Sequence, residues 1–111
     1  MSKIVILNSS RFGQGNPRLG EKLMNDFFES LANMESLPDA ILFYNSAVNL
    51  ACVEPGILNP LKSIEKRGCR LMISASSLDF YNLNKDLKAG SIASMEEMTE
   101  IMMNAESVIK P

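Results

Sequence analysis

The sequence has 111 residues, 46% of them hydrophobic, which predicts a single globular domain over residues 1–111. Eleven basic and 13 acidic residues leave a net charge of -2 without a basic patch, so we expect no nucleic-acid partner. No apolar run approaches the roughly 20 residues of a membrane helix, and the run after Lys3 is too short for a secretory signal. We therefore expect a cytoplasmic protein that does not contact a membrane.

Histidine is absent, and the only cysteines are Cys52 and Cys69. Ser-His-Asp and Cys-His catalysis both need an imidazole base, so both mechanisms are excluded. Two separated cysteines cannot complete the tetrahedral shell of an ordinary zinc site, and we expect no metal. A disulfide between them is disfavoured in the cytosol.

The first half of the chain alternates strand and helix patterns. Lys3–Asn8 contains a continuous apolar run typical of a buried parallel strand. Asn16 followed by proline predicts the start of a helix that reaches about Met34, and Gly20 within it indicates a close backbone approach. Three further segments follow: a strand over Ala40–Asn45, an irregular stretch over Ser46–Gly56, and a helix over about Ile57–Arg67. The start of that helix stays open, because Pro60 fits best in a first turn.

The second half continues the alternation. Cys69–Ser74 predicts a third buried strand, and Ser77–Asn84 a short helix. Ser94 and Glu97 have the spacing of a capping box, which predicts a helix to about Ala105 between short strands at Gly90–Ala93 and Ser107–Lys110. This order predicts an α/β fold of three layers, α/β/α, around a mostly parallel sheet of four or five strands, with flavodoxin-like architecture.

Two loops that follow strands are candidate ligand sites, since ligands bind at the carboxyl edge of such sheets. The loop Ser9–Asn16 can offer backbone N–H groups to an anion, or it is an ordinary loop in which glycines relieve strain. The loop Ser74–Ser77 can hold a phosphate or carboxylate, or it is a tight turn, and Asp79 either caps a helix or faces the site. The candidate ligand-binding residues are Ser9, Ser10, Gly13, Gly15, Asn16, Asn45, Ser74, Ser76, Ser77 and Asp79.

Sulfur side chains allow two further interpretations. Cys69 begins a buried strand, where cysteine behaves as a small hydrophobic residue, whereas Cys52 lies in a loop and is the more reactive thiol if either is. Without a surrounding motif, the interpretation that both are inert is preferred. Met95, Met98 and Met102 share a helix face, which indicates core packing, a subunit interface or a surface for partners.

Several segments resemble the DsrE/DsrF-like family, in particular the carboxyl-terminal DsrE-like domain of sulfurtransferase-like proteins linked to selenium metabolism. Residues 13–24 resemble the family's Gly-x-Gly-Asp-x-x-Leu-Gly-x-x-Leu-Met pattern, with Asn16 replacing the acid. Tyr44–Val48 resembles its Asn-x-Gly-Val turn, and segments 78–81, 88–90 and 108–111 also match. The resemblance spans essentially the whole chain, without the companion amino-terminal domain. It implies a homo-oligomer, a trimer or a hexamer of two trimers, with a sulfur-relay protein as a partner.

The chain departs from that family at its sulfur-carrying loop. The subfamily reads Cys-Gly-Thr-Cys-Leu-Asp-Tyr-Tyr there, whereas this chain has Ser74 and Ser77 in place of both cysteines. A serine oxygen cannot form a persulfide, because that chemistry needs a thiolate. Cys69 is roughly 17 Å from Ser74 along an extended strand. Cys52 remains a candidate carrier if its loop folds over the same sheet edge.

The leading hypothesis is therefore a binding or scaffolding subunit of sulfur or selenium metabolism that is not an enzyme and needs no cofactor. Its site would lie between Ser9–Asn16, Asn45–Cys52 and Ser74–Ser77. One alternative is a sulfur carrier that uses Cys52. Another is a small flavodoxin-like or flavin-reductase-like enzyme with flavin mononucleotide (FMN), because Asn8-Ser-Ser-Arg and Gly13-Gln-Gly-Asn resemble the phosphate loop of such reductases. A third is an interaction module that uses the methionine face.

Overall fold

Five parallel strands form one sheet in the order β4-β3-β2-β1-β5, as seen in a computed structural model that describes residues 2–53 and 55–111. In chain order the elements are β1 (Lys3–Leu7), α1 (Pro17–Ala32), β2 (Ala40–Phe43), the 3₁₀ helix η1 (Asn45–Ala51), α2 (Pro55–Lys66), β3 (Arg70–Ser74), α3 (Ala75–Phe80), β4 (Ser91–Ala93), α4 (Met95–Asn104) and β5 (Ser107–Ile109). The α/β/α fold and the parallel sheet expected from the sequence are confirmed.

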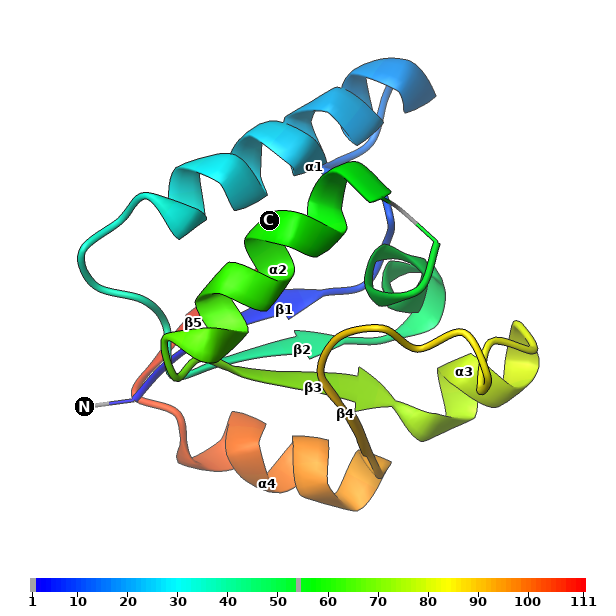
Figure 1. Ribbon diagram of the computed structural model, residues 1–111. Coiled ribbons are helices and arrows are strands. Elements are labelled where there is room, and N and C mark those ends of the chain that lie inside the picture. The colour runs from blue at the N-terminus through cyan, green and yellow to red at the C-terminus, as the bar shows by residue number, and fades with distance from the viewer. Residues whose placement is uncertain (1, 54) are drawn as a thin grey trace.

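Helices cover both faces of the sheet, which explains why the central strands are apolar throughout. Helices α1 and α2 lie on one face and α4 on the other (Figure 1). The larger core, between the sheet, α1, α2 and η1, contains Phe28, Phe43 and Leu61, each with no exposed surface. The smaller core, beneath α4, is built around Leu42 and Met98. Strands buried on both sides cannot alternate polar and apolar residues, so their sequences read as continuous apolar runs.

The register brings the carboxyl ends of the three central strands to one level. Leu7 of β1 pairs with Phe43 of β2, and Phe43 pairs with Ile73 of β3. The Tyr44 N–H then donates to the Leu7 carbonyl at 3.0 Å, so the chain leaves β2 close to the end of β1. The segments that follow β1, β2 and β3 therefore begin side by side at one edge of the sheet.

Helix α1 begins as the sequence predicts. Asn16 is the N-cap, and its side-chain oxygen accepts hydrogen bonds from the Arg18 and Leu19 amides at 2.9 and 3.2 Å. The close approach expected at Gly20 is present, because an added Cβ would lie 3.0 Å from the Cβ of Arg11. The Phe12 N–H also donates to the Gly20 carbonyl at 3.0 Å. The loop after β1 is thereby fixed against the first turn of α1.

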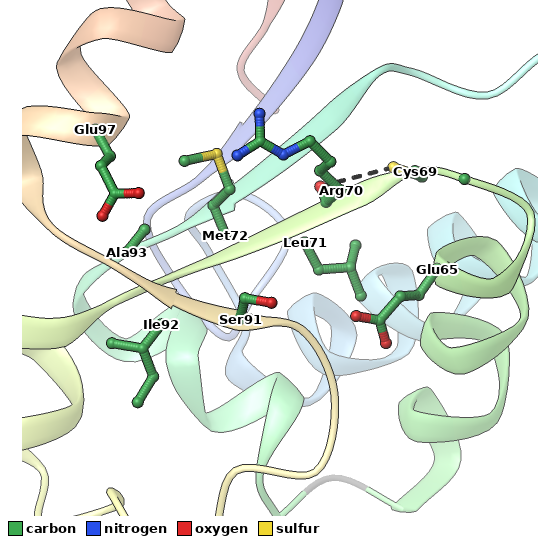
Figure 2. Close-up of a pocket in the computed structure, with 10 residues that line it drawn as sticks. Glu65, Cys69, Arg70, Leu71, Met72, Ser91, Ile92, Ala93 and Glu97 are labelled. Atoms are coloured by element: carbon green, nitrogen blue, oxygen red, sulfur yellow. Dashed lines mark hydrogen bonds between the residues drawn. The ribbon is translucent and has the colours of Figure 1, made fainter.

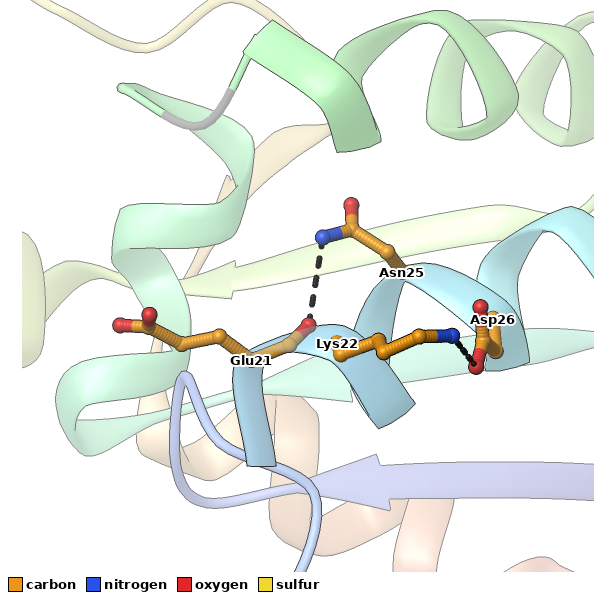
Figure 3. Close-up of polar contacts among 4 residues, drawn as sticks. All are labelled: Glu21, Lys22, Asn25 and Asp26. Atoms are coloured by element: carbon orange, nitrogen blue, oxygen red, sulfur yellow. Dashed lines mark hydrogen bonds and ion pairs between the residues drawn. The ribbon is translucent and has the colours of Figure 1, made fainter. Parts of the chain in front are cut away.

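The outer face of α1 is mostly polar, as expected for a helix that covers one side of a sheet, although Leu19 and Leu23 are 54% and 38% exposed. Lys22 and Asp26 form an exposed ion pair one turn apart, with 3.0 Å between Nζ and Oδ2 (Figure 3). The Asn25 side-chain amide donates to the Glu21 carbonyl at 3.2 Å (Figure 3). An exposed pair of this spacing stabilises a helix by only about 0.3–0.5 kcal/mol, so α1 depends mainly on its buried face.

Three expected boundaries need correction. Helix α2 starts at Pro55, so Pro60 lies inside the helix rather than in its first turn. At this interior position the missing N–H of Pro60 removes one helical hydrogen bond. Helix α3 starts at Ala75 rather than Ser77, because the Ser74 side chain acts as its N-cap. The segment after β2, expected to be irregular, contains the 3₁₀ helix η1, which buries Val48 and Leu50.

Helix α4 confirms the capping box. The Ser94 side chain accepts from the Glu97 amide at 3.1 Å, and the Glu97 carboxylate accepts from the Ser94 amide at 3.0 Å. The hydrogen bonds that the Glu97 carboxylate accepts from the Ser94 amide and from Ser94 Oγ, the latter at 3.2 Å, lower the pKa of this exposed carboxyl, with a smaller contribution from the charge of Arg70. Within residues 2–53 and 55–111, no helix combines the length and apolar character needed to cross a membrane.

Candidate functional site

Two hydrogen bonds link the segments that follow β1, β2 and β3. The Ser10 amide donates to Ser46 Oγ at 3.1 Å, which connects the first loop to η1. The Asn45 amide donates to Ser77 Oγ at 2.8 Å, which connects η1 to α3. Asn45 adopts a left-handed conformation, with φ of 55°, that asparagine tolerates better than most residues. The structure thus brings the predicted segments together at the carboxyl edge of the sheet.

Ser74 and Ser77 form a hydrogen-bonded pair at the start of α3. Ser74 Oγ accepts from the Ser77 amide at 3.2 Å and from Ser77 Oγ at 3.0 Å. Only 4% of Ser74 is exposed, so its oxygen is buried and accepts two hydrogen bonds. No imidazole is present to activate it. The arrangement fixes the turn between β3 and α3 and provides no nucleophile.

A cleft of about 370 Å³ opens between the end of β2 and helix α3. Tyr81 O–H donates to Asn45 Oδ1 at 2.9 Å across one side of it. Phe80 lies beside Tyr81 with ring centroids 5.2 Å apart and planes at 87°, yet 82% of Phe80 is exposed. The six lining residues are Tyr44, Asn45, Ser76, Ser77, Phe80 and Tyr81. Three aromatic rings, four hydroxyls (two of serine and two of tyrosine) and one carboxamide therefore surround the cleft, without a charged side chain.

The first loop does not line this cleft, in contrast to the predicted site that combined all three segments. Ser9 Oγ accepts from the Arg11 amide at 3.1 Å, and Asn16 caps α1. Gly13 and Gly15 have φ of 85° and 130°, which are left-handed values that favour glycine. Asn16 already binds the amides of Arg18 and Leu19, which are groups that an anion at this helix start would use. The geometry matches the interpretation in which the glycines relieve strain.

Asp79 also lies outside the cleft lining. Its Oδ1 accepts a short hydrogen bond of 2.6 Å from the Asn84 side-chain amide. The amide of Asn82, which has φ of 58°, donates to the Asp79 carbonyl at 3.1 Å. Asp79 therefore stabilises the turn after α3, and of the predicted ligand residues only Asn45, Ser76 and Ser77 line the cleft.

Neither cysteine presents an accessible thiol. Cys52 was expected in a loop, but it ends η1 with only 2% of its surface exposed. Burial, and then the negative charge of Asp86, raise the pKa of the Cys52 thiol. Cys69 is 3% exposed, and burial followed by the charges of Asp39 and Glu65 raises its pKa to about 11. At neutral pH both are neutral thiols, which favours the interpretation that both cysteines are inert over a reactive Cys52.

A second depression of about 270 Å³ lies where β4 leaves part of β3 uncovered (Figure 2). Arg70 and Glu97 project near Met72 from β3 and α4, while Glu65 lies at the other end (Figure 2). The Glu65 carboxylate accepts from the Gly90 amide at 3.1 Å, and Glu97 belongs to the capping box of α4. Both carboxylates thus stabilise local backbone, and none of the predicted ligand residues lies here.

The sequence reasoning did not identify the aromatic residues of the cleft. Tyr44 follows the apolar run of β2 and was placed within the predicted strand. Phe80 and Tyr81 follow the serine loop and served only as part of a family match. Two adjacent aromatic residues at the end of a short helix beside a polar loop could have indicated the cleft, because only one of them, here Tyr81, can pack against the core.

Comparisons with known proteins support the fold. No family model and no curated protein matches the sequence. The ychN protein of E. coli is similar over 100% of both chains, with 18% identity and a TM-score of 0.67. MTH1491 of Methanobacterium thermoautotrophicum, a protein of unknown function, is similar over 100% of both chains, with 14% identity and a TM-score of 0.69. BT1422 of Bacteroides thetaiotaomicron, also of unknown function, shares 13% identity over 99% of this chain and 95% of its own, with a TM-score of 0.65.

Proposed function

We propose that this protein is a DsrE-like binding subunit of sulfur or selenium metabolism that has no thiol-based sulfur transfer. The observation that carries the proposal is the state of Ser74, at the position where the resembled family has its sulfur-carrying cysteine. The Ser74 oxygen is buried and accepts two hydrogen bonds from Ser77. A serine in this position supports the turn and cannot form a persulfide.

The state of the two cysteines supports the same proposal. A sulfur carrier needs a thiolate that a donor and an acceptor can both reach. Cys52 and Cys69 are each at least 97% buried, and burial raises the pKa of both thiols. This also weighs against the alternative in which Cys52 carries sulfur.

Persulfide trapping tests the proposal directly. The native protein is incubated with inorganic polysulfide, treated with iodoacetamide, and analysed by mass spectrometry with a Cys52→Ser variant as control. We expect alkylation of both thiols to be much slower in the folded protein than in urea, without a persulfide that reaches an acceptor thiol. A persulfide on Cys52 that is passed to an acceptor would overturn the proposal.

The proposal includes a cytoplasmic homo-oligomer, a trimer or hexamer, with a sulfur-relay protein as partner. Apolar side chains at both sheet edges and on the outer side of α4 support an assembly: Ile92, Val108, Ile109, Met95 and Met103 are 43–80% exposed. Met98 is instead buried against the sheet, so the methionine face is divided between core and surface. Native mass spectrometry measures the assembly, and a monomer at micromolar concentration would contradict this part.

Flavin binding has less support. The α1 cap occupies amides that a phosphate would use, and the aromatic cleft has no cationic side chain for the phosphate of FMN. The visible spectrum after addition of FMN and removal of unbound flavin tests this alternative. A retained yellow chromophore would favour the flavin hypothesis over the proposed function.

A further inference from the structure

We propose that the cleft beside α3 binds an uncharged, flat aromatic ring that carries a hydrogen-bond acceptor, as in an aromatic carboxamide. The inference rests on the proposed function, since it concerns the same carboxyl edge of the sheet, and it adds the class of ligand. The cleft volume of about 370 Å³ lies in the lower part of the roughly 300–1,000 Å³ range of small-molecule sites.

The aromatic part of the ligand follows from Phe80. A phenylalanine with 82% of its surface exposed has at least one open ring face, and exposed aromatic surface is unfavourable in water. The perpendicular contact with Tyr81 limits how the Phe80 ring can turn. A flat ring in the cleft would stack on the open face of Phe80 and remove apolar surface of both from water. The contribution of Tyr44 to the same lining extends the apolar contact.

The hydrogen-bond acceptor follows from Asn45. The Asn45 Oδ1 accepts from Tyr81 O–H at 2.9 Å, which fixes which end of the carboxamide faces Tyr81. No residue in the described part of the chain accepts from the Asn45 Nδ2 group, and Ser76 Oγ likewise has no partner there. A carbonyl oxygen on the ligand would complete the bonding of these donors.

The absence of charge on the ligand follows from the lining. None of the six residues around the cleft carries a charge at neutral pH. A carboxylate or ammonium that entered would lose part of its hydration without gaining an ionic partner. An uncharged ligand loses less on binding, and the cleft therefore selects against charged analogues of the same shape.

The protein provides a clean reporter of this cleft. It contains two tyrosines and no tryptophan, and both tyrosines line the cleft. Tyrosine labelled with ¹³C at the ε ring carbons therefore gives one NMR signal for each tyrosine, and both signals report on the cleft. The probes are benzamide, benzoate, which is charged, and cyclohexanecarboxamide, which has no aromatic ring. We expect saturable shifts of both signals with benzamide. The dissociation constants of benzoate and cyclohexanecarboxamide should be at least about twofold higher than that of benzamide.

Two variants separate the contacts. Phe80→Ala removes the stacking surface of a largely exposed residue, and we expect benzamide binding to weaken about two- to tenfold. Asn45→Asp keeps the acceptor for Tyr81 and removes the Nδ2 donor, and we expect a similar loss. Met34→Ala, 55% exposed in the loop after α1 and outside the cleft lining, is the matched control and should bind as the unmodified protein does.

Several outcomes would overturn the inference. These are no saturable tyrosine shift with benzamide, equal affinity for all three probes, or unchanged binding in Phe80→Ala and Asn45→Asp. Urea unfolding of each variant verifies that it is folded before titration. Failure here leaves the persulfide result unchanged, whereas sulfur transfer through Cys52 would refute the proposed function whether or not benzamide binds.

Discussion

Replacement of Ser77 by alanine tests the hydrogen-bonded connection between η1 and α3. The Ser77 side chain accepts from the Asn45 amide at 2.8 Å and donates to Ser74 Oγ at 3.0 Å. A net contribution of about 0.5–1.5 kcal/mol for each bond gives a loss of roughly 1–3 kcal/mol. Asn45 is exposed, so water replaces part of its lost bond, and we expect about 1–2 kcal/mol.

Ser76→Ala is the matched control for this measurement. Ser76 lies one residue earlier in the same helical turn, is exposed, and has no side-chain hydrogen bond within the described part of the chain. Alanine improves helix propensity by a similar amount at both positions, so that effect cancels in the comparison. The difference between the two variants therefore measures the hydrogen bonds of Ser77.

Urea unfolding followed by far-ultraviolet circular dichroism gives the comparison. With a slope of about 1–3 kcal/mol per molar urea, a loss of about 1–2 kcal/mol should place the midpoint of Ser77→Ala roughly 0.3–2 M below that of Ser76→Ala. Equal midpoints would refute the reasoning, because they would mean that Ser77 does not stabilise the junction of η1 and α3. The slopes of the two variants should agree if both unfold in the same way.

Three further changes have calculable effects on the free energy of unfolding. Gly90→Ala should lower the free energy of unfolding by about 2–5 kcal/mol, because φ is 80° and the added Cβ would lie 2.9 Å from the Leu71 carbonyl oxygen. Gly13→Ala is the control, since Gly13 has a similar φ of 85° but open space around it, and should cost only the backbone strain of about 1–2 kcal/mol. Equal urea midpoints for the two variants would contradict the steric contribution at Gly90. Arg67→Ala should lower stability in thermal unfolding by about 1–2 kcal/mol, because the guanidinium donates to the carbonyls of Ala32, Met34 and Glu35 at 2.6–3.2 Å. Arg67→Lys should recover only part of this stability, since an ammonium cannot make the same set of bonds. Full recovery in Arg67→Lys would show that charge alone matters. Between about pH 9 and 11 the Cys69 thiol ionises in the unfolded chain but stays protonated in the folded protein, where its pKa is raised to about 11. The free energy of unfolding should therefore fall as the pH rises through this range. Urea midpoints should fall less steeply with pH in Cys69→Ala, and parallel profiles would disprove the assignment to Cys69.

Local signals predicted most of the fold because they act within a few residues. The capping box at Ser94 and the N-cap at Asn16 are contacts between close neighbours, and both formed as expected. The continuous apolar runs of β1 and β3 likewise report burial on two faces. Gly20 indicated a close approach correctly, although the sequence did not show that Arg11 is the neighbour.

The site was harder to predict because it depends on distances across the sheet. The sequence placed Ser9–Asn16 and Ser74–Ser77 at one edge, but each loop satisfies most of its own polar groups locally. Burial of Cys52 results from η1, which a sequence without strong helical periodicity did not predict. The cleft arises where Tyr44 leaves β2 opposite Phe80, a juxtaposition that only the pairing of β2 with β3 creates.

The position of β5 has a consequence for folding order during synthesis. Strand β1 pairs with β2 on one side and with β5 on the other, and contacts between Ser2 and Glu106 join residues 104 positions apart. Residues 1–106 must therefore leave the ribosome before β1 gains its second neighbour. Until then β1 has an open, apolar edge, the feature that favours pairing with strands of other chains. The nascent protein is expected to be most prone to aggregation in that interval, and removal of residues 107–111 would make the interval permanent.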